Sequence, residues 1–134
     1  MKRTVQLATV FGLGVIIGAA TIPTLSAQLR TQTDKRLITV DLAGFCNGKY
    51  VAIDYSEESA GLIAKHYHPG HLFNYILEGS RKVTVEGAPP QIIHSGEIHH
   101  ELPMRPNVSE NLSAAKVLTF RLLEKGTRES VQVP

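Results

Sequence analysis

The chain has 134 residues, of which 43% are hydrophobic and 19% are charged, and this composition is that of an ordinary globular protein. It fits a single domain and excludes a collagen-like or intrinsically disordered chain. The net charge of +2 comes from Lys2 and Arg3, because the 14 basic residues less these two equal the 12 acidic residues. The sequence has no basic cluster beyond Arg81-Lys82, so we expect no nucleic-acid partner. The single cysteine, Cys46, cannot form an internal disulfide.

Residues 1–27 differ sharply from the rest of the chain. Lys2 and Arg3 precede an apolar run at residues 10–22, and small residues follow at Ser26-Ala27. This order is typical of a secretory signal peptide, so we expect an exported protein, either periplasmic or secreted. The alternative is an uncleaved membrane anchor, which would normally need about 20 apolar residues.

The rest of the chain divides into three parts. Residues 28–36 are polar and lack periodicity, so we interpret them as a flexible lead-in, and residues 127–134 as a polar tail. Between them, over residues 37–126, apolar residues recur in short runs separated by turn signals such as Asn47-Gly48 and Gly79-Ser80. We predict strands at Leu37–Leu42, Tyr50–Tyr55, Leu62–His68, Leu72–Glu78, Lys82–Glu86, Gln91–His94, Ile98–Leu102 and Ala115–Leu123.

Short strands spaced by roughly 8–12 residues predict an all-β sandwich or barrel. No segment of this region sustains an apolar period of 3.6 residues, so we expect helices to be minor. A closed barrel would remove the strand edges and would enclose a small pocket.

Half of the six histidines fall within His66-Tyr67-His68-Pro69-Gly70-His71. On a strand, residues i and i+2 point to the same face, so His66 and His68 should project side by side. Two parallel imidazoles form half of a transition-metal site. They could instead hydrogen-bond a ligand without any metal, and the spacing alone leaves both interpretations open.

Two segments resemble the motifs of the cupin superfamily. Residues 61–70, continued through Tyr75-Ile76-Leu77-Glu78-Gly79, resemble the first motif, and residues 96–113 partly resemble the second. The resemblance extends from about Leu42 to Glu124. It implies a single jelly-roll barrel (a double-stranded β-helix), homodimer formation and a small organic ligand. It also implies a divalent metal, which could be iron, manganese, zinc, nickel or copper, and an oxygenase-like or isomerase-like activity if the protein is an enzyme.

The resemblance carries over only part of the family's ligand set. The two leading metal histidines match His66 and His68, but the glutamate falls on Leu72 and the last histidine on Asn107. Leucine cannot bind a metal, and an amide is a poor ligand for transition metals. His71 lies one residue before the glutamate position and would face the other way unless a bulge redirects it.

Other residues could complete the site. The candidates are His71, Asn74, His94, His99, His100 and Glu101. Only one of the adjacent His99 and His100 can point inward from a strand. We therefore predict a site of His66, His68 and one of His71 or His99, with Asn74 or Asn107 nearby. For Glu97 and Glu101, acid–base roles are open, but anchoring of a loop is the commoner role for a single glutamate.

The sequence leaves two functional hypotheses. In the first, a metal on His66 and His68 acts on a small organic substrate. In the second, the same pocket binds a ligand without metal and without catalysis, in a structural or stress-related role. The sequence contains no Gly-x-Ser-x-Gly elbow, Cys-x-x-Cys pair or phosphate-binding glycine loop, which disfavours serine hydrolases, thiol oxidoreductases and nucleotide enzymes.

Overall fold

The computed structural model describes residues 31–44 and 46–134, so the predicted signal segment lies outside the described residues. Every regular element within these ranges is a strand. The described residues therefore include no helix long and apolar enough to span a membrane. The strands are β1 (Gln32–Asp41), β2 (Lys49–Glu58), β3 (Gly61–Tyr67), β4 (His71–Glu78), β5 (Ser80–Val85), β6 (Gln91–His94), β7 (Ile98–Glu101), β8 (Asn107–Asn111), β9 (Ala115–Glu124) and β10 (Val131–Gln132).

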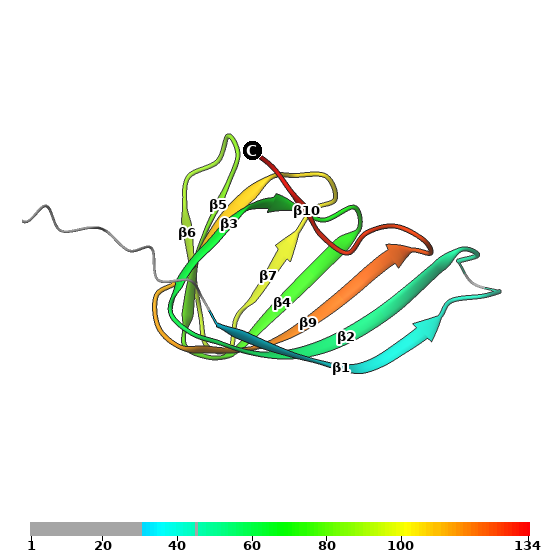
Figure 1. The fold of residues 1–134 in the computed structure, drawn as a ribbon, viewed down its shortest axis with the longest axis horizontal. Helices are drawn as coiled ribbons and strands as arrows, with labels where there is room; N and C mark the ends of the chain where they lie inside the picture. Colours follow the sequence, from blue (N-terminus) through cyan, green and yellow to red (C-terminus); the bar gives the residue numbers. More distant parts are fainter. Residues whose placement is uncertain (1–30, 45) are drawn as a thin grey trace, which may run out of the picture.

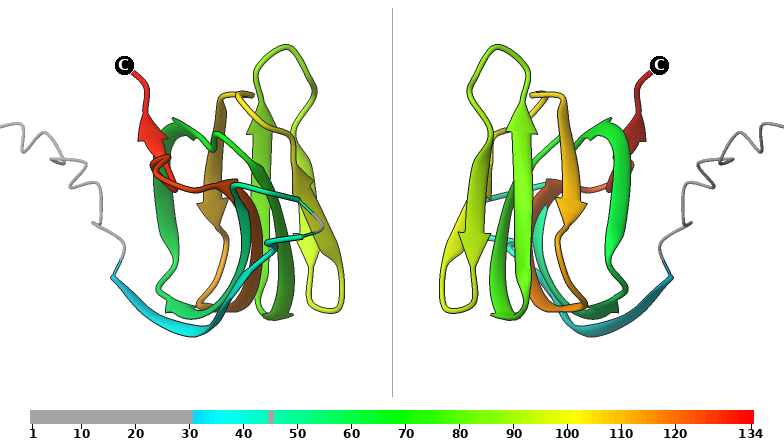
Figure 2. Two further views of the ribbon diagram at one scale, coloured as in Figure 1. Left: turned by 90° about the vertical axis from the view of Figure 1, so that its right-hand side faces the viewer. Right: turned by 90° about the vertical axis from the view of Figure 1, so that its left-hand side faces the viewer.

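The strands form two antiparallel sheets that face each other (Figures 1 and 2). Sheet A has the order β1-β2-β9-β4-β7, and sheet B has the order β10-β3-β8-β5-β6. Consecutive strands often lie in different sheets, as β2 and β3 do, so the chain crosses repeatedly between the two layers. The all-β prediction is confirmed, and each predicted strand overlaps an observed one.

The structure contains strand residues that the sequence pattern did not predict. β1 begins at Gln32, inside the segment that we interpreted as a lead-in, and pairs with β2 along its whole length. β10 lies within the predicted polar tail, and β8 follows a proline-containing loop. Backbone hydrogen bonds hold these strands, and they need no apolar side chains. β8 even turns Asn107, Ser109 and Asn111 inward, so it shows no apolar alternation.

The tight turns follow the predicted chemistry. Gly48, Gly79 and Gly96 all have positive φ angles, between 77° and 88°. At the β4–β5 hairpin, a Cβ on Gly79 would also collide with the backbone oxygen of Ala114. Asn47 keeps a negative φ, so the Asn47-Gly48 turn needs the left-handed conformation at the glycine only.

The interior is divided between an apolar and a polar part. Ile76, Val83, Ile93, Ala115 and Val117 form the apolar core between the sheets. The other inward positions are mostly polar, and many of these side chains are at least nine-tenths buried. Burial of polar groups is costly unless each finds a partner, so this part of the interior depends on side-chain hydrogen bonds.

The polar part of the interior contains a buried ion pair. The guanidinium of Arg81 donates to Glu58 Oε2 at 2.6 Å and to Asn111 Oδ1 at 2.8 Å. Asn111 Nδ2 and Ser56 Oγ also donate to the Glu58 carboxylate, at 2.7 and 2.9 Å. The four side chains come from both sheets, so the network connects the two layers.

Replacing Arg81 with alanine should destabilise the domain by about 3–5 kcal/mol, because it leaves a buried carboxylate without its guanidinium. The free energy of unfolding in urea measures this change. The matched control is Lys116→Ala, which removes an exposed ion pair with Glu78 at 2.8 Å and should cost far less than the Arg81 substitution. Similar losses for the two variants would contradict this account of the interior.

Candidate metal centre

His66 and His68 lie side by side in the polar interior, as their two-residue spacing predicts. His66 is in β3 and His68 directly follows this strand. Their side chains line the same pocket, and the residues are only 7% and 6% exposed. The ring centroids are 4.9 Å apart and the planes are nearly perpendicular, at 87°. Two imidazoles are therefore already held together within the protein.

Backbone carbonyl groups select the tautomer of both rings. His66 Nδ1 lies 2.8 Å from the carbonyl oxygen of Ala64, and His68 Nδ1 lies 2.5 Å from that of Glu129. A carbonyl oxygen can only accept a hydrogen bond, so Nδ1 is the protonated nitrogen of each ring, and in the neutral ring Nε2 carries the lone pair. Metal-binding histidines are commonly oriented by such bonds from their second nitrogen.

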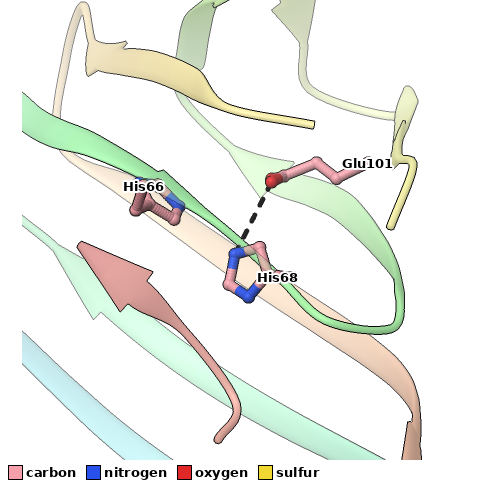
Figure 3. Close-up of side chains that lie close together, drawn as sticks. All are labelled: His66, His68 and Glu101. Atoms are coloured by element: carbon pink, nitrogen blue, oxygen red, sulfur yellow. Dashed lines mark ion pairs between the residues drawn. The ribbon is translucent and has the colours of Figure 1, made fainter. Parts of the chain in front are cut away.

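A third potential ligand atom comes from Glu101 at the end of β7. Its carboxylate and the two imidazoles place one ligand atom each within 4.8 Å of one another, and all three residues are buried (Figure 3). Glu101 Oε2 is 3.6 Å from His68 Nε2. Glu101 is paired directly with Leu72 across β4 and β7. Glu101 therefore places a carboxylate on the strand next to Leu72, the position where the cupin motif would have its glutamate.

Two amide side chains hold the Glu101 carboxylate. Asn74 Nδ2 donates to Oε1 at 2.7 Å, and Asn107 Nδ2 donates to Oε2 at 2.8 Å. The hydroxyl groups of Thr119 and Ser109 donate to the amide oxygens of Asn74 and Asn107, at 2.8 and 3.1 Å. These bonds fix each amide with its nitrogen towards Glu101. Asn74 and Asn107 therefore lie beside the centre and orient its carboxylate.

The structure does not bring His71 to this cluster. β4 buries Leu72, Asn74 and Ile76, and His71 lies on the opposite face. The register of β4 with β9 is regular at this point, so no bulge redirects the side chain. Instead, His71 Nδ1 lies 3.0 Å from His100 Nε2, and His100 stacks on Phe73 with centroids 4.3 Å apart.

The remaining candidates also lie outside the three-residue cluster. His99 points inward and His100 outward, as alternation requires. Burial lowers the pKa of His99, which favours its neutral form, and its Nε2 atom has no hydrogen-bond partner among the described residues. His94 is exposed, and its backbone N–H donates to Glu97 Oε2 at 2.7 Å. Glu97 therefore anchors a turn.

The cluster opens into a pocket of about 280 Å³ between the sheets. Hydroxyl, amide and charged groups from both sheets and from the C-terminal segment line it. At its rim, the Asp54 carboxylate is paired with the guanidinium groups of Arg36 and Arg121. Burial lowers the pKa of Arg121 from its ordinary value. The pocket can thus admit a small polar molecule next to the histidines.

The donor set fits a divalent transition metal. Two neutral imidazole nitrogens and one carboxylate oxygen are the ligands that zinc, iron, manganese, nickel and copper accept in proteins. Three protein ligands are fewer than the four to six that these metals take, so exogenous ligands would have room to bind. Sequence reasoning identified the two histidines and included Glu101 among the candidates, but it proposed His71 or His99 as the third ligand.

Comparisons with known proteins identify the fold. No protein family model matches the sequence, and no curated protein matches it either. Among solved structures, it resembles the DMSP lyase DddQ of Ruegeria pomeroyi DSS-3, with a TM-score of 0.62, 20% identity and 76% of this chain covered. The chain spans about half of that protein, 51%.

Two further solved structures show the same likeness. A cupin superfamily protein of Desulfitobacterium hafniense DCB-2 has a TM-score of 0.58 and 13% identity, with 70% of this chain and 79% of that chain covered. For oxalate decarboxylase of Lactobacillus farciminis the TM-score is 0.50 and the identity 15%, with 62% and 26% covered. Together with the two facing antiparallel sheets, these likenesses show that the chain has the cupin fold.

Proposed function

We propose that the protein binds one divalent transition metal through His66, His68 and Glu101, and that it holds a small organic ligand in the adjoining pocket. The observation that carries this proposal is the pair of Nδ1 hydrogen bonds to backbone carbonyls. They direct both lone pairs to Nε2, next to a carboxylate that two amides already orient. A pocket that only needed polar walls would not require this arrangement.

The metal, when bound, would supply a Lewis acid or an oxygen-activating centre next to the pocket. The chain's own residues would position the organic ligand: Ser109 and Thr119 offer hydroxyl groups, and the rim offers the charged groups of Arg121 and Glu129. Two proteins of similar fold are a DMSP lyase and an oxalate decarboxylase by name. For this chain, action on a small organic compound is part of our proposal. The alternative is a metal-free binding protein.

Metal analysis of the full chain tests the centre. We expect one equivalent of metal after growth with iron, zinc, manganese, nickel and copper supplied. The variants His66→Ala, His68→Ala and Glu101→Ala should each raise the apparent Kd by about 100-fold or more.

The matched controls are His94→Ala and Glu97→Ala, because both residues are exposed and lie outside the cluster. They should keep the metal. An intact protein without metal would favour the metal-free alternative, and metal that survives Glu101→Ala would show that the third ligand is misplaced.

A double-mutant cycle tests the role of the amides. Asn107→Ala removes a donor to the Glu101 carboxylate and should cost about 1.5–3 kcal/mol of unfolding free energy in the metal-free protein. In a Glu101→Ala background the same substitution should cost clearly less, because the charged acceptor is gone. Equal costs in both backgrounds would show that Asn107 contributes through packing alone.

We further propose that the protein is exported and forms a homodimer. Export rests on the order of residues in 1–27, which precede the described part of the chain. The proposal of a dimer is based on the outer face of sheet A. On this face four apolar residues are neighbours in register across four strands: Ile38, Ile53, Phe120 and Phe73. Three of these residues are 37–47% exposed. Such contiguous apolar surface is typical of an interaction site, and a second copy presents an identical patch.

Sedimentation velocity tests this face. Phe120→Lys places a charge in the middle of the apolar row and should convert a dimer into monomers. The control is Ile92→Lys, because Ile92 is 51% exposed but belongs to the other sheet. A monomeric wild-type protein, or a dimer that survives Phe120→Lys, would refute the proposed interface.

A further inference from the structure

The C-terminal segment, residues 125–134, crosses the pocket from one sheet to the other, and we call it the strap. It leaves β9 through a turn in which Gly126 has a φ of 82° and Thr127 Oγ1 donates to the Glu124 carbonyl. It then reaches sheet B, where β10 pairs with β3 (Figures 1 and 2). Strap residues Glu129, Ser130 and Gln132 line the pocket.

Glu129 connects the strap to both sides of the pocket. Its backbone carbonyl accepts the hydrogen bond from His68 Nδ1. Its carboxylate lies 2.6 Å from Arg36 Nη2 in β1 and 3.8 Å from Arg121 Nη1 in β9. One residue therefore orients a metal-site histidine and bridges two arginines at the rim.

The contacts that close the strap are individually weak. β10 has two residues at the edge of its sheet. Two further backbone bonds hold the strap, from Val133 N to the Lys65 carbonyl at 3.0 Å and, at its start, from Lys125 N to the Gly48 carbonyl at 2.7 Å. The Glu129 side chain is 41% exposed, and exposed ion pairs contribute at most about 1 kcal/mol. Local opening therefore requires much less free energy than unfolding of the sheets.

Opening would change the metal centre as well as access to it. Without the Glu129 carbonyl, the proton of His68 can occupy either ring nitrogen, and the ring loses the bond that fixes its orientation. Bonds of this kind typically affect metal affinity by 10–100-fold. His66 differs in this respect, because its acceptor, the Ala64 carbonyl, lies within β3 itself.

We propose that the strap is a gate that also positions His68. In the closed state it keeps His68 Nε2 able to bind the metal, and in the open state it releases both the ring and the pocket. Glu129 is the positioning residue and acts through His68. This inference rests on the proposed metal centre.

The first test is the rate of metal release to a strong chelator, measured on the full chain. Glu129→Gln keeps the backbone carbonyl but removes the charge that pairs with the arginines, and should accelerate release about fivefold. Its control, Glu78→Gln, removes a similarly exposed carboxylate from a pair with Lys116 and should leave the rate unchanged. Deletion of residues 127–134 removes the carbonyl itself and should accelerate release by about 10–100-fold.

The second test needs no metal. Imidazole 15N NMR of the metal-free protein should show His68 protonated at Nδ1 in the full chain and a mixture of tautomers after the deletion, while His66 stays unchanged. An unchanged His68 tautomer, or release rates within twofold of wild type for both strap variants, would overturn the gate. If the intact chain bound no metal, the proposed centre would fail, but the NMR measurement would still decide whether the strap orients His68.

Discussion

The polar interior around the pocket depends on the hydrogen bonds that the buried Glu101 carboxylate accepts from two amide side chains. This carboxylate lies next to His68 and accepts bonds from Asn74 in sheet A and Asn107 in sheet B, so it connects the two layers at the pocket. A buried negative charge is costly unless it is hydrogen-bonded or paired with a cation. The two amides meet part of this requirement, and a divalent metal between the histidines and Glu101 would meet the rest. If the proposed metal binds, the same carboxylate links folding to metal binding.

The position of Glu101 offers a way in which a barrel of cupin fold could hold a metal although Leu72 occupies the place of the motif's glutamate. Leu72 and Glu101 are cross-strand partners whose side chains point inward. Moving the carboxylate from one strand to its neighbour keeps it on the same face of the sheet, one strand spacing away. Asn107 is paired with His66 and donates to this relocated carboxylate. Both departures from the family pattern therefore converge on one residue.

Strands with apolar runs, and the His66–His68 pair, were predictable because they depend on spacing within one strand. β8 and β10 were not, because polar residues point inward from β8 and only two residues form β10. The choice of Glu101 as the proposed third ligand was also beyond local reasoning. Alternation correctly excludes His71 in the absence of a bulge, but choosing Glu101 requires the register of β4 with β7, which is set by the fold. The role of Glu129 depends on a contact 61 residues away from His68.

The most direct test of the central claim is a crystal structure of the metal-loaded protein, with the metal located by anomalous scattering at its absorption edge. We predict one metal bound by Nε2 of His66, Nε2 of His68 and a carboxylate oxygen of Glu101, at about 2.0–2.2 Å. His68 Nδ1 should remain bonded to the Glu129 carbonyl. A metal held by His71 and His100, or a barrel interior that takes up no metal, would contradict the account.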